Sequence, residues 1–179
     1  MMPDGSMQTA AQSFAPSPAT ARAFRDCLGR FASGVTVVTA PTSQGGIGMT
    51  ANSFTSVSLD PALILWCPAK ASSRFSAFSS ASHFAIHVLA ADQEEVARSF
   101  AKSAQVFDDH ASHLSVAGVP LLHNCLARFE CETHAMHDAG DHAIMIGRVL
   151  TAQMSDGAPL VFSQGCFIPF DNRREKPNQ

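Results

Sequence analysis

Two neighbouring stretches of the chain are rich in small polar side chains: GMTANSFTSVSLDP, residues 48–61, and CPAKASSR, residues 67–74. The first alternates as a β-strand does, but hydroxyl, amide and small side chains occupy most positions on both of its faces. Strands usually place β-branched or aromatic residues on at least one face. A strand built in this way lets a flat molecule approach the backbone closely.

These residue types favour the binding of a planar polar heterocycle that carries a phosphate. Backbone N–H and C=O groups can meet the ring edge, while hydroxyls and an amide add uncharged hydrogen bonds. In the second stretch, Lys70, Ser72, Ser73 and Arg74 lie within one short segment. If this segment begins a helix, its free N–H groups, hydroxyls and cations would form a cradle for the phosphate.

The same residues also fit a purely structural interpretation, in which the polar strand is an exposed edge and SSR begins an ordinary helix. No G-x-G-x-x-G or P-loop is present, which disfavours a Rossmann or nucleoside triphosphatase site. His83 and His87 lie in a predicted strand, where side chains four residues apart are ~13 Å apart and cannot share one ion. We therefore expect no metal site.

The elements that would position these groups are mostly strands. Apolar, β-branched or alternating runs predict strands, and these outnumber the predicted helices. No strand–helix alternation runs along the chain, which disfavours a doubly wound sheet and favours a mainly β, antiparallel barrel with peripheral helices. The strands expected before residue 91 cover residues 35–40, 47–58, 62–67 and 83–90, and further strands follow residue 125.

Local signals also predict helices. Residues 20–33 place Phe24, Cys27, Leu28 and Phe31 on one stripe, with Gly34 as the expected stop. Residues 92–101 open with Asp92 as N-cap and Glu95 three residues on, which is the capping-box pattern. A short helix is expected within residues 71–82.

Composition limits the partners and the compartment. The net charge of −3 gives no basic surface for nucleic acid or an anionic membrane. No apolar run approaches the ~20 residues that span a bilayer. Five cysteines without a CxxC motif predict reduced thiols and a cytoplasmic protein. We expect a disordered arm over residues 1–20, one domain over 21–171 and a flexible tail over 172–179.

Five segments in this order resemble the short-chain flavin reductases, the reductase components of two-component flavin-dependent monooxygenases. The segments are FRDCLGRFASGVTVVTA, GMTANSFTSVSLDPALILWC, HFAIHVLAADQEEVARSFA, GVPLLHNCLARFECE and GDHAIMIGRV. The resemblance spans roughly residues 23–170. It implies an FMN-binding split barrel, a homodimer with flavin near the subunit interface, and reduction of FMN or FAD by NADH or NADPH. The reduced flavin would then pass to a separate monooxygenase.

The resemblance also implies site residues, by their positions in this sequence. His142, in GDHAI, would lie near the flavin and the nicotinamide, where it or Phe167 would position the incoming ring, although a loop histidine that merely caps a strand remains the alternative. Hydride transfer depends on alignment more than on an acid or base. The predicted flavin contacts are Ser33, Gly34, Val35, Thr36, Met49, Thr50, Ala51, Asn52, Ser53, Cys67, Lys70, Ser72, Ser73, Arg74 and Phe167.

One departure and several alternatives remain. His87 stands where family members often have asparagine, so near a flavin it would be expected to titrate close to neutral pH. Arg74, Arg98, Arg128 and Arg148 are all candidates for binding the 2′-phosphate of NADPH. The rival functions are a flavin-binding carrier or sensor without reductase turnover, and an oxidase of a phosphorylated pyridine ring. The oxidase would be expected to carry more basic residues around the phosphate.

Overall fold

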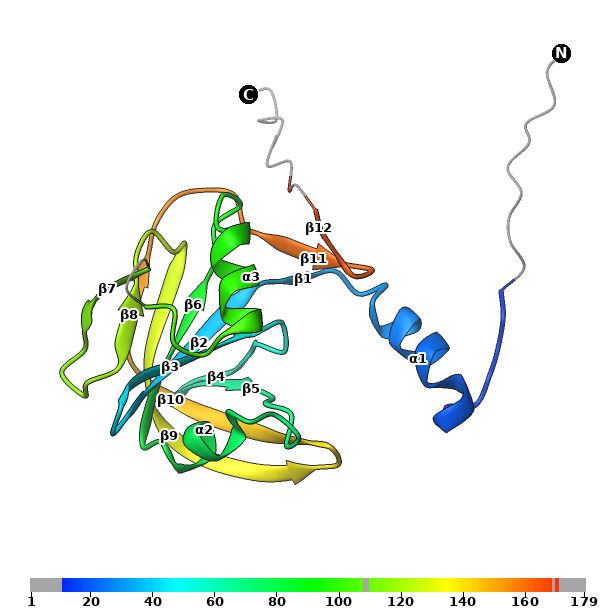
Figure 1. The fold of residues 1–179 in the computed structure, drawn as a ribbon, viewed down its shortest axis with the longest axis horizontal. Helices are drawn as coiled ribbons and strands as arrows, with labels where there is room; N and C mark the ends of the chain where they lie inside the picture. The colour runs from blue at the N-terminus through cyan, green and yellow to red at the C-terminus, as the bar shows by residue number, and fades with distance from the viewer. Residues whose placement is uncertain (1–10, 108–109, 169, 171–179) are drawn as a thin grey trace, which may run out of the picture.

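The computed structural model describes residues 11–107, 110–168 and 170. Its main element is a curved, wholly antiparallel sheet with the strand order β3-β2-β6-β9-β10-β5-β4 (Figure 1). The sheet does not close, because β3 and β4 are its two edges. The mainly β, antiparallel split barrel with peripheral helices is thus confirmed, as an open sheet. Its strands are β2 (Thr36–Thr42), β3 (Gly45–Ala51), β4 (Thr55–Leu59), β5 (Ala62–Trp66), β6 (His83–Val88), β9 (Ala127–Ala139) and β10 (His142–Met154).

Smaller elements surround this sheet. A three-stranded sheet, called the small sheet below, has the order β1-β11-β12, and β7 pairs with β8 in a separate hairpin. The remaining strands are β1 (Ser33–Gly34), β7 (Ala111–Leu114), β8 (Pro120–Leu122), β11 (Val161–Ser163) and β12 (Cys166–Ile168). The helices are the 3-10 turn η1 (Pro18–Thr20), α1 (Ala21–Leu28), α2 (Phe75–Ser80) and α3 (Glu94–Lys102).

The polar stretch at residues 48–61 forms two strands where one was predicted. Its first half belongs to β3, which pairs with β2, and its second half forms β4, which pairs with β5. Residues 52–54 cross between the two edges of the sheet. A chain of this length spans at most about 14 Å between Ala51 and Thr55, so the crossing holds the edges near each other. The periodicity continues through both strands, which is why the sequence did not reveal the change of partner.

Helix α3 lies against β3, and a glycine makes this contact possible. A Cβ added at Gly48 would lie 2.4 Å from the Phe100 ring, far inside van der Waals contact. The same ring belongs to a buried cluster with Val37, Leu89 and Leu122. Gly48 therefore lets α3 approach β3 closely enough to form one wall of the site described below.

The start of α3 differs from the capping-box prediction. Gln93, not Asp92, is the N-cap residue, and no side chain there caps the helix. The Gln93 side chain instead accepts a hydrogen bond from the Ala90 amide and donates one to the His123 carbonyl. A buried glutamine thus joins α3 to the segment after β8, which local sequence signals could not indicate.

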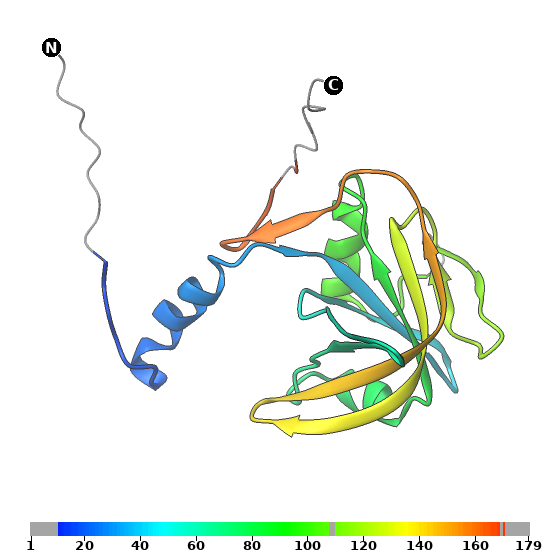
Figure 2. The same ribbon diagram turned by 180° about the vertical axis from the view of Figure 1, so that it is seen from behind.

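Helix α1 is shorter than predicted and lies apart from the sheet in both ribbon views (Figures 1 and 2). It ends at Leu28 with Gly29 as its cap, and Gly34 lies in β1. The predicted apolar stripe is not buried, since Phe24, Leu28 and Phe31 are 42%, 59% and 81% exposed. No residue of α1 is buried within this chain.

The predicted tails fall mostly on residues outside the described ranges, namely 1–10 and 171–179. Of the predicted arm, residues 11–20 are described, and they end in η1, where Ser17 and Thr20 form a capping box. In the part of the chain that the structure describes, no helix has the length and apolar character needed to cross a bilayer.

Candidate functional site

A cavity of ≈ 300 Å³ lies where β3 ends beside α3 and the small sheet. It brings together five residues that the sequence predicted for the site: Val35, Thr50, Ala51, Asn52 and Phe167. They come from three separate parts of the chain, which supports a common site. The remaining lining residues are Ala97, Arg98, Ala101 and Phe162.

The floor of this cavity is the outer edge of β3. The Gly48 amide donates to the Ala104 carbonyl and the Gly48 carbonyl accepts from Arg74, so both groups face away from β2. Orientation alternates along an antiparallel strand, so the amide and carbonyl of Thr50 face the same way. Thr50 lines the cavity. The structure therefore offers backbone donors and acceptors to the polar edge of a ring, beside small side chains.

Side-chain hydrogen bonds hold this edge in place. The Thr50 hydroxyl donates to the Ala97 carbonyl of α3 at 2.6 Å. The Thr36 hydroxyl donates to the Ala51 carbonyl at 2.7 Å from the β2 side. The two threonines fix β3 against both neighbours, so its exposed amides keep one geometry.

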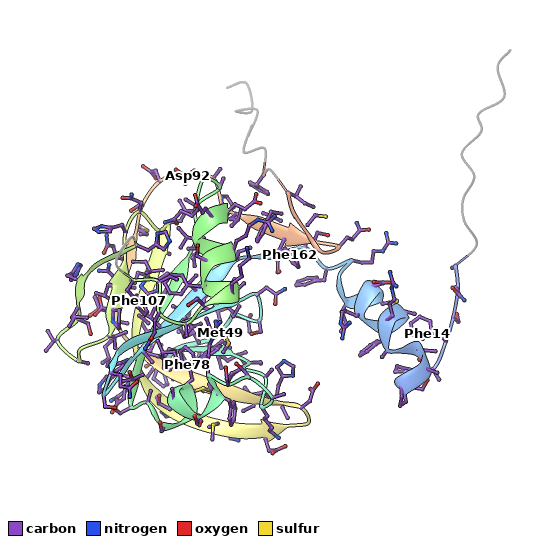
Figure 3. The ribbon with its side chains drawn as sticks, in the orientation of Figure 1. Phe14, Met49, Phe78, Asp92, Phe107 and Phe162 are labelled. Atoms are coloured by element: carbon purple, nitrogen blue, oxygen red, sulfur yellow. The ribbon has the colours of Figure 1, made fainter. Side chains whose placement is uncertain are left out.

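Two aromatic rings form the opposite wall. Phe162 of β11 and Phe167 of β12 meet edge to face with centroids 5.4 Å apart. Phe162 lies on the side of α3 that faces the small sheet (Figure 3). The Arg98 guanidinium lies 4.9 Å from the centre of the Phe167 ring. A polar floor and aromatic walls suit a flat heterocycle such as an isoalloxazine.

Ser53 and Cys67 are joined directly to each other. The Ser53 hydroxyl accepts from the Cys67 amide at 2.9 Å and lies 3.4 Å from the Cys67 carbonyl. Burial raises the pKa of the Cys67 thiol. The pair fixes the crossing segment, residues 52–54, against the end of β5, so it orients the floor whether or not it touches a ligand.

The predicted phosphate cradle is engaged with protein groups. Arg74 donates to the carbonyls of Gly48, Phe100 and Ala101, and burial lowers its pKa. Lys70 donates to Asp138 and to the Gly140 carbonyl. Neither cation lines the ≈ 300 Å³ cavity. Their role in binding phosphate stays a prediction.

The other predicted contacts do not line the cavity. Thr36 is buried, and the side-chain oxygen of Ser33 is buried without a hydrogen-bond partner in the described residues. Gly34 pairs with Val161 of β11, so β1 carries the small sheet beside the floor. Met49 packs on the main core cluster (Figure 3), and the Ser72 hydroxyl accepts from the Arg74 amide. Ser73 lies between Ser72 and Arg74 in the chain.

His142 occupies the predicted junction, directly after the turn at Gly140, whose φ is +69°. Its Nδ1 lies 2.8 Å from a carboxylate oxygen of Asp141, and this contact lowers the pKa of Asp141. The side chain is 43% exposed. His142 does not line the cavity, since the tip of the β9–β10 hairpin and the small sheet lie well apart in Figures 1 and 2. Its role toward nicotinamide stays a prediction.

The expectation for His87 is wrong. The ring is fully buried, with Nδ1 3.0 Å from the Val37 carbonyl oxygen and Nε2 accepting from the Leu122 amide at 3.2 Å. Burial lowers its pKa to about 3, and the nearby Arg128 lowers it further. His87 is therefore a neutral link between β2, β6 and β8, and it does not titrate near neutral pH.

A larger cavity of ≈ 490 Å³ lies between α3 and the β8 end, lined by Asp92, Gln93, Val96, His110, Leu122, His123 and Asn124. None of the predicted site residues lines it. We place the site in the smaller cavity because only there do the free β3 edge and the aromatic wall meet.

Sequence reasoning did not place the helix side of the cavity, although Arg98 was one of four arginines considered for the 2′-phosphate of NADPH. Ala97, Arg98 and Ala101 share one face of α3 through their spacing, but that spacing does not show what the face contacts. The strand of Phe162 was expected, but Phe162 was missed because the sequence does not show which surface that strand packs on.

Comparison with known proteins shows the family to which the chain is similar. Residues 28–169 match the family described as "Flavin reductase like domain". The chain is 54% identical over 160 residues to the FMN reductase (NADH) SmoA of Agrobacterium fabrum, covering 89% of this chain and 92% of that protein. It is 44% identical over 152 residues to the reductase component of the flavin-dependent trigonelline monooxygenase of Acinetobacter baylyi, covering 82% of this chain and 48% of that protein. The chain thus spans about half the length of this second relative.

The structure is also similar to that of the NADH:FAD oxidoreductase SgcE6 of Streptomyces globisporus in complex with NAD and FAD fragments. The TM-score is 0.84 at 38% sequence identity, covering 91% of this chain and 100% of that chain.

Proposed function

The chain belongs to the flavin reductase family, and we propose that it uses NADH or NADPH to reduce FMN or FAD and supplies the reduced flavin to a partner monooxygenase. The observation that carries the proposal is the cavity in which the free edge of β3 faces two aromatic rings. A flavin bound there supplies the acceptor atom N5 for a hydride from nicotinamide C4.

The residues of the chain bind and align rather than exchange protons. The amide and carbonyl of Thr50 meet the polar edge of the ring, and Asn52 adds an amide side chain. Phe162 and Phe167 exclude water from one side of the cavity. Such alignment is the main requirement for hydride transfer between two stacked rings.

The other predicted contacts are part of this proposal. The junction of β1 and β2, next to the floor, would contribute Ser33, Gly34, Val35 and Thr36. The β3 side would be completed by Met49, Ala51 and Ser53. Cys67 supports Ser53. Ser72 and Ser73 would offer hydroxyls to the phosphate, and Lys70 and Arg74 would support this segment through their bonds to protein groups. His142 lies outside the cavity, at the tip of the β9–β10 hairpin, and keeps its predicted role of positioning the nicotinamide. Its partial exposure leaves one ring nitrogen free of Asp141 for that role.

We further propose a homodimer in which α1 packs on a second copy of the chain. The support is the exposed apolar stripe of α1, because a helix with no buried residue is stable mainly when another surface covers it. The five cysteines are all free, which supports a reducing location such as the cytoplasm.

Initial rates with NADH and NADPH, each crossed with FMN and FAD, test the proposed function. Flavin-dependent oxidation of at least one nicotinamide is the expected result. A protein that binds flavin and stays yellow without oxidising either nicotinamide would instead be a carrier or sensor, and the proposal would fail.

A further inference from the structure

Arg98 carries the one ionisable side chain among the described residues that line the ≈ 300 Å³ cavity. The other lining residues are apolar, hydroxyl or amide residues. Flavin mononucleotide and the nicotinamide dinucleotides all carry phosphate, so a cavity that holds them needs a compensating cation nearby.

The two cations of the predicted phosphate cradle are already bound to protein groups. Lys70 forms an ion pair with Asp138 and donates to the Gly140 carbonyl at 2.6 Å. Arg74 donates to three carbonyls, two of them in the last turn of α3. Moving either cation to a ligand would leave those partners unsatisfied.

Arg98 is held much more weakly. Among the residues that the structure describes, its one ionic partner is Glu94, four residues earlier on the same helix, with Nη2 2.6 Å from Oε1. The two side chains are 60% and 46% exposed. Exposed ion pairs with this spacing contribute little to stability. A phosphate that accepts two parallel hydrogen bonds from the guanidinium can replace such a pair.

Phe167 keeps Arg98 at the cavity. The guanidinium carbon lies 4.9 Å from the ring centroid, a distance at which a cation is attracted to an aromatic face. Phe167 itself lines the cavity and packs on Phe162. The ring therefore positions the charge at the cavity wall, opposite the floor formed by β3.

We propose that Arg98 is a specificity-determining residue that leaves Glu94 and binds a phosphate group of the ligand in this cavity, either of the flavin or of the nicotinamide dinucleotide. The inference rests on the proposed function and names the residue that binds the charged part of the ligand. It predicts that the contribution of Arg98 is confined to ligands that carry phosphate.

The test compares wild type, Arg98→Ala, Arg98→Lys and the control Lys102→Ala. Lys102 is an exposed cation of the same helix that does not line the cavity. Dissociation constants are measured for FMN and for riboflavin, which lacks the phosphate. With riboflavin as acceptor, KM is measured for NADH and for reduced nicotinamide riboside, which also lacks phosphate.

For Arg98→Ala we expect at least a tenfold weakening for one phosphate-bearing ligand, with its phosphate-free counterpart within twofold of wild type. If only FMN binding is weakened, Arg98 binds the flavin phosphate. If only the KM for NADH rises, Arg98 binds a phosphate of the dinucleotide. Arg98→Lys should fall between wild type and alanine, because lysine keeps the charge but not the paired donors. Lys102→Ala should match wild type.

Equal losses for phosphate-bearing and phosphate-free ligands would overturn the inference, as would no loss for any ligand. The wild-type protein separates this outcome from failure of the proposed function. If wild type oxidises NADH with FMN while Arg98→Ala behaves as Lys102→Ala does, only the role of Arg98 is wrong. If wild type shows no flavin-dependent oxidation, the proposed function itself fails.

Discussion

The hydroxyl of Thr50 donates a 2.6 Å hydrogen bond to the carbonyl of Ala97, forty-seven residues later in the chain. This bond joins the floor of the cavity, β3, to its helical wall, α3. The geometry of the site thus depends on a contact between two elements that approach each other only in the folded protein.

Replacing Thr50 by valine tests this contact. The substitution keeps the shape but removes the donor, which is expected to cost about 1 kcal/mol and to weaken flavin binding roughly fivefold. Thr42→Val is the matched control, since it removes an exposed hydroxyl bond to the Gly45 carbonyl away from the cavity. Flavin titration followed by fluorescence measures both. Equal flavin affinities in the two variants would contradict the role of Thr50.

His87 should make the protein sensitive to acid. Its folded pKa of about 3 lies below the ordinary value of 6.5, so the unfolded state binds the proton more readily. The contribution of neutral His87 to stability is therefore fully present above pH 6.5 and is lost as the pH falls toward 3. Between pH 7 and pH 5 this one group accounts for about 2 kcal/mol of unfolding free energy.

Urea unfolding of wild type and His87→Asn at both pH values checks this expectation. The asparagine variant lacks the titrating ring, so it should lose about 2 kcal/mol less than wild type over the same interval. The remaining titratable groups contribute equally to both proteins and cancel in the comparison. The same pH dependence in both proteins would show that His87 is not the group responsible.

Arg74→Met should weaken the whole site rather than the binding of phosphate. The variant leaves the carbonyls of Phe100 and Ala101 without their donor and removes the guanidinium that joins α3 to the Gly48 carbonyl. We expect a loss of about 2 kcal/mol in stability, with FMN and riboflavin weakened by similar factors. Calorimetry and flavin titration measure the two effects. A loss confined to FMN would instead assign Arg74 to the phosphate.

The double variant Phe24→Ser, Leu28→Ser should abolish self-association through α1. Both side chains are exposed in the single chain, so the substitutions should leave the fold of one copy intact. Val116→Ser is the control, because it removes an even more exposed apolar side chain from outside α1. Sedimentation velocity is expected to show a dimer for wild type and control. A dimer in the double variant would exclude α1 as the interface.

The sequence predicted the floor of the site better than its walls. Thr50, Ala51 and Asn52 could be identified because a strand that exposes its backbone must have small polar side chains, and that requirement is local. Phe162 could not be identified, and Arg98 could not be ranked above the three other candidate arginines, since both positions depend on how the small sheet and α3 pack on β3. An arginine looks the same in sequence whether its partner is a phosphate or, as for Arg74, the last turn of a helix.

The fold was predictable to a similar degree. Alternating and β-branched runs identified most strands, because burial of one face fixes their period. The stripe of α1 correctly indicated an apolar surface but not where that surface is covered. His87 was misjudged because an imidazole reads as a titrating group in sequence, while its buried partners, Val37 and Leu122, come from other strands.

The open sheet also has a consequence for handling the protein. Unpaired strand edges can recruit strands from other molecules, and such edges are a common origin of aggregation. Here β3 and β4 are both edges, and Val57 and Leu59 of β4 are 47% and 95% exposed. A bound heterocycle that occupies the amides of β3 would shield one of these edges. Purified preparations should therefore remain clear for longer when stored with flavin than without it.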